Sequence, residues 1–195
     1  MKISTLAFLL LISFVCYTYD INLLRAINLG RNTSLDQLLI YITHSAALLA
    51  YGIPVMLLLF SLLKGNIEQQ KNALYIIIAV LLCAAIASIF KYAIDRPRPF
   101  ITYTFLQNIT EGGSPSFPSG HTCDAFAFAA AISLVYKKWF IVIPAFLWAF
   151  AVGYSRMALG VHYPSDVAGG ILIGCTSAAL SYEVKKRFIN QKINA

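Results

Sequence analysis

The chain alternates long apolar runs with short polar connections. The two clearest runs, Leu38–Leu63 and Ala73–Phe90, contain no acidic residue, lysine or arginine. A helix of about 20 apolar residues crosses the hydrocarbon core of a bilayer, and a backbone in lipid must satisfy its own hydrogen bonds. The pattern predicts an all-α, polytopic membrane helix bundle with about six transmembrane helices. The six apolar segments are Ile3–Tyr19, Leu38–Leu63, Ala73–Phe90, Asp124–Tyr136, Trp139–Gly153 and Val167–Tyr182.

The first apolar segment has two interpretations. Because Lys2 precedes it, Ile3–Tyr19 could be a signal peptide that is removed. No cleavage site of the small-x-small type precedes Asp20, so a retained span is the favoured interpretation. In the stretch that follows, Asp20–Asp36, apolar and polar positions alternate loosely, which predicts a short helix lying in the membrane interface.

The composition favours a membrane protein over a soluble one. Hydrophobic residues make up 59% of the chain and charged residues 12%, whereas a soluble domain has about 45–50% apolar and about 25% charged residues. No repeat or change of composition divides the sequence, so residues 1–195 are predicted to form a single domain. We expect neither a metal nor a cofactor, because the four cysteines share no metal-ligand spacing. They are Cys16, Cys83, Cys123 and Cys175.

The net charge of +7 does not indicate a nucleic-acid partner, because the basic residues form short clusters between the apolar segments. Clusters of this kind orient a membrane protein, with more lysine and arginine on the cytoplasmic side. With the N-terminus inside, nine basic residues lie inside: Lys2, Lys64, Lys71, Lys137, Lys138, Lys185, Lys186, Arg187 and Lys192. Six lie outside: Arg25, Arg31, Lys91, Arg96, Arg98 and Arg156. The connections 91–121 and 155–166 then share the outer face, which in a bacterium is the periplasmic or extracytoplasmic side of the inner membrane.

These two outer connections contain polar residues that a plain helix bundle does not need. Lys91, Arg98 and Arg156 suit an anion with several oxygens, because arginine matches phosphate oxygens two at a time and lysine adds a point charge. Ser119 and Gly120 stand just before an apolar helix, whose first N–H groups receive phosphate readily. The serine hydroxyl adds a donor, and glycine lets the backbone approach the ligand closely. The five residues predict a phosphate-binding site.

The second connection also carries a candidate nucleophile. His162 and Asp166 are four residues apart, and Pro164 is placed to be the first residue of the last helix. The Asp166 carboxylate can accept the Nδ1–H of His162, which leaves the Nε2 lone pair free to attack. This is the logic of a hydrolase triad with histidine as nucleophile, although the pair could also be a structural hydrogen bond at a helix start.

His121 has a complementary predicted task. A leaving group in phosphoryl transfer needs a proton, and a positioned histidinium can donate it. The same imidazole, once neutral, can deprotonate the water that hydrolyses a phosphohistidine. The reaction therefore needs His162 neutral and His121 protonated at its start.

Several other polar residues have simpler interpretations. Arg96, beside a span end, is expected to anchor lipid headgroups. His44 has no partner that the sequence identifies, and a buried or interfacial place is favoured over a catalytic one. Asp95, Glu111 and Asp124 are expected to be solvated or paired with nearby arginines.

The polar motifs resemble a known signature. Their order is Lys91…Arg98-Pro99, Pro118-Ser119-Gly120-His121 and Ser155-Arg156…His162…Asp166. This is similar to K-x6-R-P, P-S-G-H and S-R-x5-H-x3-D, the three-part signature of the type-2 phosphatidic-acid phosphatase and vanadium haloperoxidase superfamily. Every signature position is present, within residues 91–166. Because the haloperoxidases are soluble and this chain is strongly apolar, the membrane lipid phosphatase branch is indicated.

The resemblance implies a metal-independent phosphatase and a role for each matching residue. The implied catalytic residues are His162 as nucleophile, Asp166 as the residue that orients it, and His121 as acid and base. The implied phosphate-binding residues are Lys91, Arg98, Ser119, Gly120 and Arg156.

The expected substrate is a lipid phosphate, because the site lies at the surface of the bilayer. We expect hydrolysis of a phosphomonoester or diphosphate through a phosphohistidine intermediate, with undecaprenyl diphosphate as the first choice of substrate. Lipid A phosphatase, phosphatidylglycerol-phosphate phosphatase and phosphatidic-acid phosphatase are the alternatives within the family. A phosphotransferase that passes the phosphate to a second lipid is a rival, and so is a transporter with cations at its pore mouth.

Overall fold

The computed structural model describes residues 17–106, 109–110 and 112–193, and this part of the chain is helical and contains no strand. The predicted all-α fold is therefore confirmed. The predicted segment Ile3–Tyr19 lies, except for its last three residues, outside the described residues. The helices are α2 (Asp20–Gly30), the 3-10 helix η1 (Thr33–Leu35), α3 (Asp36–Leu63), α4 (Ile67–Ile94), α5 (Pro99–Thr102), α6 (Gly120–Tyr136), α7 (Trp139–Ala158) and α8 (Pro164–Ile193).

Each of the five apolar segments predicted from Leu38 onward is a helix. Four of the described helices are long and apolar enough to cross a membrane, and they fall on α3, α4, α7 and α8. The helices extend beyond the apolar runs, and α8 continues to Ile193 where the prediction ended at Tyr182. Helical hydrogen bonding does not need apolar side chains, so a helix can continue past the stretch that hydropathy marks.

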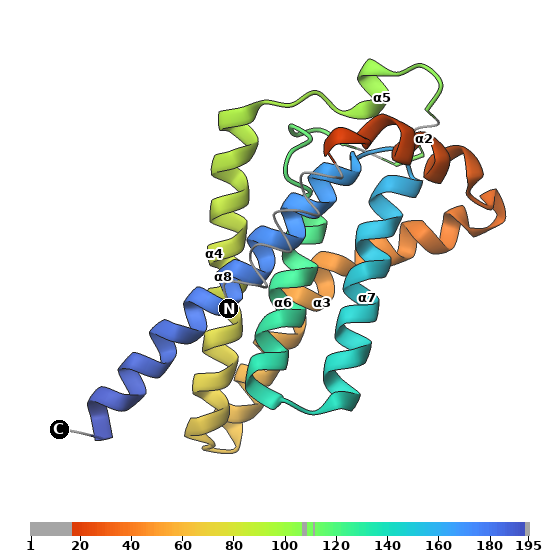
Figure 1. The fold of residues 1–195 in the computed structure, drawn as a ribbon. Helices are drawn as coiled ribbons and strands as arrows, with labels where there is room; N and C mark the ends of the chain where they lie inside the picture. The colour runs from red at the N-terminus through yellow and green to blue at the C-terminus, as the bar shows by residue number, and fades with distance from the viewer. Residues whose placement is uncertain (1–16, 107–108, 111, 194–195) are drawn as a thin grey trace.

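The shortest of these helices, α6, lies at the centre of the bundle. It has 17 residues and packs against α3, α4, α7 and α8 (Figure 1). Small residues allow the close approach of α8, because a Cβ on Gly174 would lie 2.8 Å from the backbone nitrogen of Ala127 and 2.8 Å from the carbonyl oxygen of Cys123. Close backbone contact through small residues is the usual way in which membrane helices pack.

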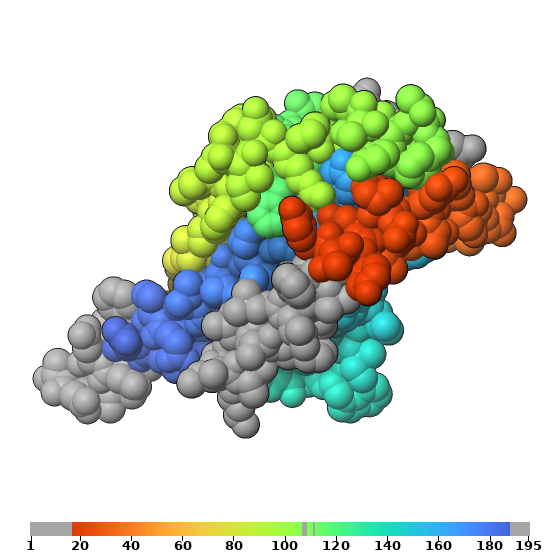
Figure 2. All heavy atoms as spheres, turned by 45° about the horizontal axis from the view of Figure 1, so that its top comes forward, coloured from red at the N-terminus to blue at the C-terminus, as the bar shows by residue number. Residues whose placement is uncertain are grey.

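The predicted short helix after the first segment is confirmed as α2. Its Leu24 and Asn28 are buried, and the Asn28 side chain donates a hydrogen bond of 2.8 Å to the carbonyl oxygen of Ala158, at the end of α7. Figure 2 looks toward the end of the bundle where α2 lies, and shows α2 beside the segment that follows α4. We call this end of the bundle the α2 end.

Both polar connections emerge at the α2 end. The C-termini of α4 and α7 and the N-termini of α6 and α8 lie there (Figure 1). The connections between α3 and α4 and between α6 and α7 lie at the opposite end. The two polar connections therefore lie together at one end of the bundle, as the predicted orientation required.

Replacing Gly174 by alanine is expected to destabilise the contact between α6 and α8. The added methyl group would meet backbone atoms at 2.8 Å, so the helices must separate, at a cost of about 1–3 kcal/mol, as for other overpacked cores. Gly52→Ala in α3 is the matched control, because its Cβ would meet nothing within 4 Å. Thermal unfolding in detergent measures both variants. Equal melting temperatures for the two would contradict the close packing of α6 against α8.

Candidate active site

The structure brings all eight predicted site residues to the α2 end of the bundle. Lys91 lies in the last turn of α4, Arg98 precedes α5, and Arg156 lies in the last turn of α7. Ser119 is the residue before α6, which begins with Gly120 and His121. His162 lies in the connection between α7 and α8, and Asp166 lies in the first turn of α8. The start of α6 is joined directly to α8, because the Ser119 N–H donates to the carbonyl oxygen of Asp166 at 3.1 Å.

Local sequence explains how these residues come to the ends of helices. Helix α4 ends where Asp95 adopts a left-handed conformation, with φ of 46°, and the R-P-R-P sequence that follows cannot continue a helix. Arg96 and Arg98 therefore stand on a non-helical segment. Pro164 is the first residue of α8, as predicted.

His162 and Asp166 form the expected pair in a buried setting. The Nδ1 of His162 lies 3.3 Å from the Oδ2 of Asp166, and the two residues are 1% and 0% exposed. Burial lowers the pKa of His162 to about 3, because the charged imidazolium loses its hydration, and this effect exceeds the opposing influence of Asp166. Arg156 and Arg98 lower the pKa of His162 further. The imidazole is therefore neutral at physiological pH.

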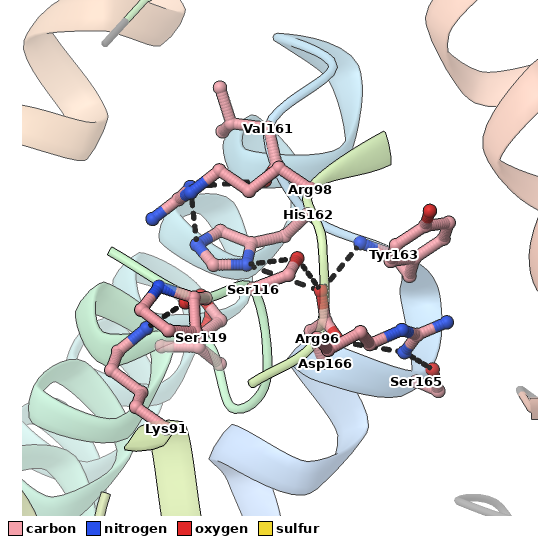
Figure 3. Close-up of polar contacts among 12 residues, drawn as sticks. Lys91, Arg96, Arg98, Ser116, Ser119, Val161, His162, Tyr163, Ser165 and Asp166 are labelled. Atoms are coloured by element: carbon pink, nitrogen blue, oxygen red, sulfur yellow. Dashed lines mark hydrogen bonds and ion pairs between the residues drawn. The ribbon is translucent and has the colours of Figure 1, made fainter. Parts of the chain in front are cut away.

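The other ring nitrogen of His162 faces a cation. Its Nε2 lies 3.3 Å from Nη1 of Arg98, and a guanidinium can only donate. With Asp166 on Nδ1 and Arg98 on Nε2, the tautomer that satisfies both contacts carries its proton on Nδ1. Arg98 is itself held by the carbonyl oxygens of Ser114 at 2.8 Å and Val161 at 3.1 Å. The lone pair of Nε2 thus points to a fixed positive charge (Figure 3).

The remaining cations are also fixed by the protein. The Lys91 ammonium donates to the carbonyl oxygen of Pro115 at 2.7 Å. The Nη1 of Arg156 donates to the Thr43 hydroxyl of α3 at 2.7 Å, and Arg156 is 3% exposed. Among the described residues, the buried Nε of Arg156 has no hydrogen-bond acceptor. A buried donor without an acceptor costs free energy, and the oxygen of a bound anion would satisfy it.

The start of α6 leaves room for a ligand. A Cβ on Gly120 would meet only the Lys91 side chain, at 3.9 Å, so a larger residue would project into the space next to this lysine. The Ser119 hydroxyl is buried and pairs with the Thr122 hydroxyl at 2.8 Å. Burial lowers the pKa of His121 to about 4, and the nearby Arg156, His44, Arg98 and Lys91 lower it further. The expectation that His121 starts protonated is therefore wrong for this structure, in which both site histidines are neutral at physiological pH.

His44 is a residue near the site that the sequence did not connect with it. Its side chain is exposed and not buried, and it follows Thr43, the residue that binds Arg156. The electrostatic interaction of His44 with His121 places both histidines in the same region. No sequence motif joins α3 to the signature, so only the packing of α3 against α6 and α7 reveals this neighbour.

Arg96 corrects a prediction. Its guanidinium does not reach toward lipid headgroups. It donates to the Oδ1 of Asp166 at 2.7 Å, to the Ser165 hydroxyl at 2.7 Å, and to the Oδ2 of Asp20 at 2.7 Å. The two carboxylates attract the cation inward because their negative charges are otherwise poorly solvated. The repeated R-P-R-P spacing was the only signal in the sequence that a second arginine faces the same site.

Asp124 differs from its predicted environment, and Ser116 is a residue of the site that the motifs did not include. Asp124 accepts a hydrogen bond of 3.1 Å from the Tyr51 hydroxyl, and no ion pair joins it to an arginine among the described residues. Ser116, which the motifs do not include, donates to the Oδ2 of Asp166. Glu111 lies outside the described residues. Within the described ranges, no group of three or more His, Cys, Asp and Glu residues is arranged to hold a metal ion.

Known proteins are similar to the chain in sequence and in fold. Residues 72–189 match the family described as the PAP2 superfamily. The undecaprenyl-diphosphatase BcrC of Bacillus subtilis is 32% identical over 142 residues, which are 73% of this chain and 70% of that protein. A lipid A 4'-phosphatase of Bacteroides thetaiotaomicron is 30% identical over 149 residues, which are 71% of this chain and 63% of that protein. The crystal structure of Aquifex aeolicus LpxE superimposes with a TM-score of 0.70 at 30% identity, over 84% of this chain and 94% of that one.

The imidazole of His162 is expected to stay neutral down to about pH 4, because its pKa lies near 3. An ordinary histidine is half-protonated near pH 6.5. His162 should reach half-protonation only near pH 3. Nitrogen chemical shifts of the three labelled histidines in detergent, assigned with the His162→Asn variant, measure the titration. A midpoint near pH 6.5 for His162 would contradict its burial.

Proposed function

Because this chain belongs to the PAP2 superfamily and is a membrane lipid phosphatase, we propose that it hydrolyses undecaprenyl diphosphate to undecaprenyl phosphate and inorganic phosphate. The chain is an integral membrane protein with four helices of spanning length among its described residues. Its similarity to the undecaprenyl-diphosphatase BcrC supports the choice of substrate. The contact that carries the phosphatase chemistry is that of a buried, neutral His162 between Asp166 and Arg98.

The terminal phosphate would be held by five groups. Lys91, Arg98 and Arg156 neutralise its charge, and the otherwise unpaired Nε of Arg156 donates to one of its oxygens. The Ser119 hydroxyl and the N–H of Gly120, at the start of α6, donate to the same phosphate. Lys91 and Arg156 lie at helix ends and need little reorganisation when the substrate binds. The N–H of Arg98 that faces Nε2 of His162 turns to the phosphate, which frees the lone pair for attack.

In the first chemical step, Nε2 of His162 attacks the terminal phosphorus. The bond from this phosphorus to the bridging oxygen breaks, and the bridging oxygen leaves with the electron pair as part of the lipid phosphate. The negative charge of the bound substrate raises the pKa of His121 from the low value that burial gives it, and the protonated imidazole then donates a proton to the leaving group. The positive charge that develops on the phosphorylated imidazole is stabilised by Asp166, on the other side of the ring.

In the second step, a water molecule hydrolyses the phosphohistidine. His121, now neutral, accepts a proton from the water, whose oxygen bonds to phosphorus while the bond from phosphorus to Nε2 breaks. Inorganic phosphate leaves, and His162 returns to its neutral form. His121 has regained the proton that it donated, so the cycle closes with one water consumed.

We further propose that residues 1–195 form one multi-pass domain of the inner membrane, with the site facing the periplasmic or extracytoplasmic side. The distribution of basic residues supports this orientation. Lys64, Lys137 and Lys138 lie in the connections at the end of the bundle opposite the site. A diphosphate headgroup presented at the outer surface would then reach the site directly.

Lipid A is the second candidate substrate. The relative from Bacteroides thetaiotaomicron is named for its action on lipid A. The proposed phosphate contacts are the same for either substrate, because they involve only the phosphoryl group. The choice therefore depends on groups of the lipid beyond the phosphate, which a substrate panel separates.

The substrate proposal predicts that undecaprenyl diphosphate gives the highest kcat/KM in a phosphate-release assay. The panel contains this lipid, lipid A, phosphatidylglycerol phosphate and phosphatidic acid, each in detergent micelles with the purified protein. His162→Ala should lower turnover of every lipid by at least about a thousandfold, as expected when a nucleophile is lost, while circular dichroism still shows the helical fold. Preference for lipid A would select the second candidate, and an active His162→Ala protein would rule out the nucleophile.

Hydrolysis is expected to continue in excess chelator. The positive charge at the phosphate would come from Lys91, Arg98 and Arg156, and these groups do not depend on divalent ions. Phosphate release before and after dialysis against EDTA, at constant ionic strength, measures this. A loss of activity that added Mg²⁺, Mn²⁺ or Zn²⁺ restores would contradict the proposed mechanism.

A further inference from the structure

We propose that Arg96, held in place by Asp20 of α2, is a positioning residue for the Asp166–His162 pair. This inference rests on the proposed role of His162 as nucleophile. It extends the catalytic pair by two residues that lie outside the signature positions, one of them in the N-terminal part of the chain. The four residues form a continuous series of contacts, from Asp20 to Arg96, to Asp166, to His162.

The arginine bridges two carboxylates with separate nitrogens. Its Nη1 lies 2.7 Å from Oδ1 of Asp166, and its Nη2 lies 2.7 Å from Oδ2 of Asp20. Both acids are nearly inaccessible to solvent, with side chains 0% and 6% exposed. The two buried carboxylates need the positive charge of Arg96 to compensate their own. A planar fork can satisfy both at once, and a lysine ammonium has no equivalent geometry.

Asp20 is itself held by the first turn of α8. One of its oxygens accepts the Ser165 N–H at 2.7 Å, and the other accepts the Ser165 hydroxyl. The first N–H groups of a helix have no partner within the helix, so Asp20 at the start of α2 satisfies such a group of α8. Ser165 immediately precedes Asp166. Asp20 of α2 is therefore connected to the Asp166 carboxylate by two routes, one through Ser165 and one through the Arg96 guanidinium.

An aromatic ring fixes the plane of the arginine. The guanidinium carbon of Arg96 lies 3.8 Å from the centre of the Tyr163 ring, a stacked arrangement that stabilises a partly desolvated cation. Tyr163 also donates its N–H to the Oδ2 of Asp166 at 3.0 Å. The same residue thus orients both partners of the Arg96–Asp166 ion pair.

The two oxygens of Asp166 have separate tasks. Oδ2 receives His162, the Ser116 hydroxyl and the Tyr163 N–H, whereas Oδ1 receives Arg96. Figure 3 shows Arg96 on the side of Asp166 opposite to His162. The hydrogen bond to Oδ1 therefore sets the rotation of the carboxylate and with it the direction of Oδ2 toward the imidazole.

The expected effect of Arg96 is on turnover and not on substrate binding. Arg96 has no contact with Lys91, Arg98 or Arg156 in the described contacts, and its charge is already matched by Asp20 and Asp166. The charge on His162 develops only during the reaction, so a misplaced Asp166 weakens the transition state more than the bound substrate. KM should therefore remain near its wild-type value while kcat falls.

The experiment compares steady-state kinetics of Arg96→Gln, Arg96→Lys, Asp20→Asn and the Arg96→Gln/Asp20→Asn double variant on the best lipid of the panel. We expect kcat of Arg96→Gln to fall by about 10- to 100-fold, the range typical of partners that orient a catalytic ligand, with KM changed less than about twofold. Arg96→Lys, which keeps the charge but not the fork, should lie between it and wild type. Because Asp20 and Arg96 act on the same carboxylate, the double variant should lose less than the product of the two single losses.

A second ion pair of the same types provides matched controls. Arg31 and Asp36 pair at 2.9 Å near the start of α3 and have no contact with Asp166. Arg31→Gln and Asp36→Asn should lower the melting temperature without lowering kcat. Wild-type kcat in Arg96→Gln, a kcat loss equal to that of Arg31→Gln, or multiplicative losses in the double variant would each overturn the inference.

The same assay keeps this inference separate from the proposed function. If the wild-type protein releases no phosphate from any lipid, or His162→Ala remains active, the proposed function fails. If wild type is active and His162→Ala is not, but Arg96→Gln turns over normally, only the positioning role fails.

Discussion

The buried carboxylate of Asp166 is the constraint on which the rest of the site depends. It is 0% exposed, and an uncompensated ionised carboxylate in such a setting costs several kcal/mol. The compensation comes from four donors: Arg96, Ser116, the Tyr163 N–H and the Nδ1–H of His162. These belong to the α4–α5, α5–α6 and α7–α8 connections, so satisfying one charge fixes three otherwise separate segments together at the α2 end.

Close packing of α6 and α8 makes this arrangement possible. At Gly170, a Cβ would lie 3.0 Å from the carbonyl oxygen of Ser119, and at Gly174 it would collide with the α6 backbone. Without side chains at these positions the N-termini of the two helices come side by side. Asp166 in the first turn of α8 and the free N–H groups of α6 then share one small region, where both the nucleophile and a phosphate can be held.

The electrostatics of the site divide into two regions with His162 between them. Arg98 stands on the Nε2 side, and Arg156 and Lys91 interact electrostatically with it. Asp166 stands on the Nδ1 side, with Arg96 and Asp20 behind it. Burial lowers the pKa of His162 to about 3 and keeps its imidazole neutral, so the ring can donate to the carboxylate while its lone pair faces the cations. A lipid phosphatase needs both sides of this arrangement. The cations attract the anionic substrate to the nucleophile, and the Asp166 carboxylate stabilises the positive charge that develops on His162 during the attack.

The sequence by itself predicted the helical bundle and the eight candidate site residues, because each depends on local patterns, whereas most helices extend past the apolar runs. Apolar runs of spanning length must be helices in lipid, Pro164 opens α8, and the spacing of His162 and Asp166 brings them together across one turn. Tertiary structure alone decided the role of Arg96, whose partners Asp20 and Asp166 are 76 and 70 residues away, and the place of His44 near His121. No local preference distinguishes an arginine that reaches a headgroup from one that turns inward, because the outcome depends on which buried charges the packed helices bring within its reach.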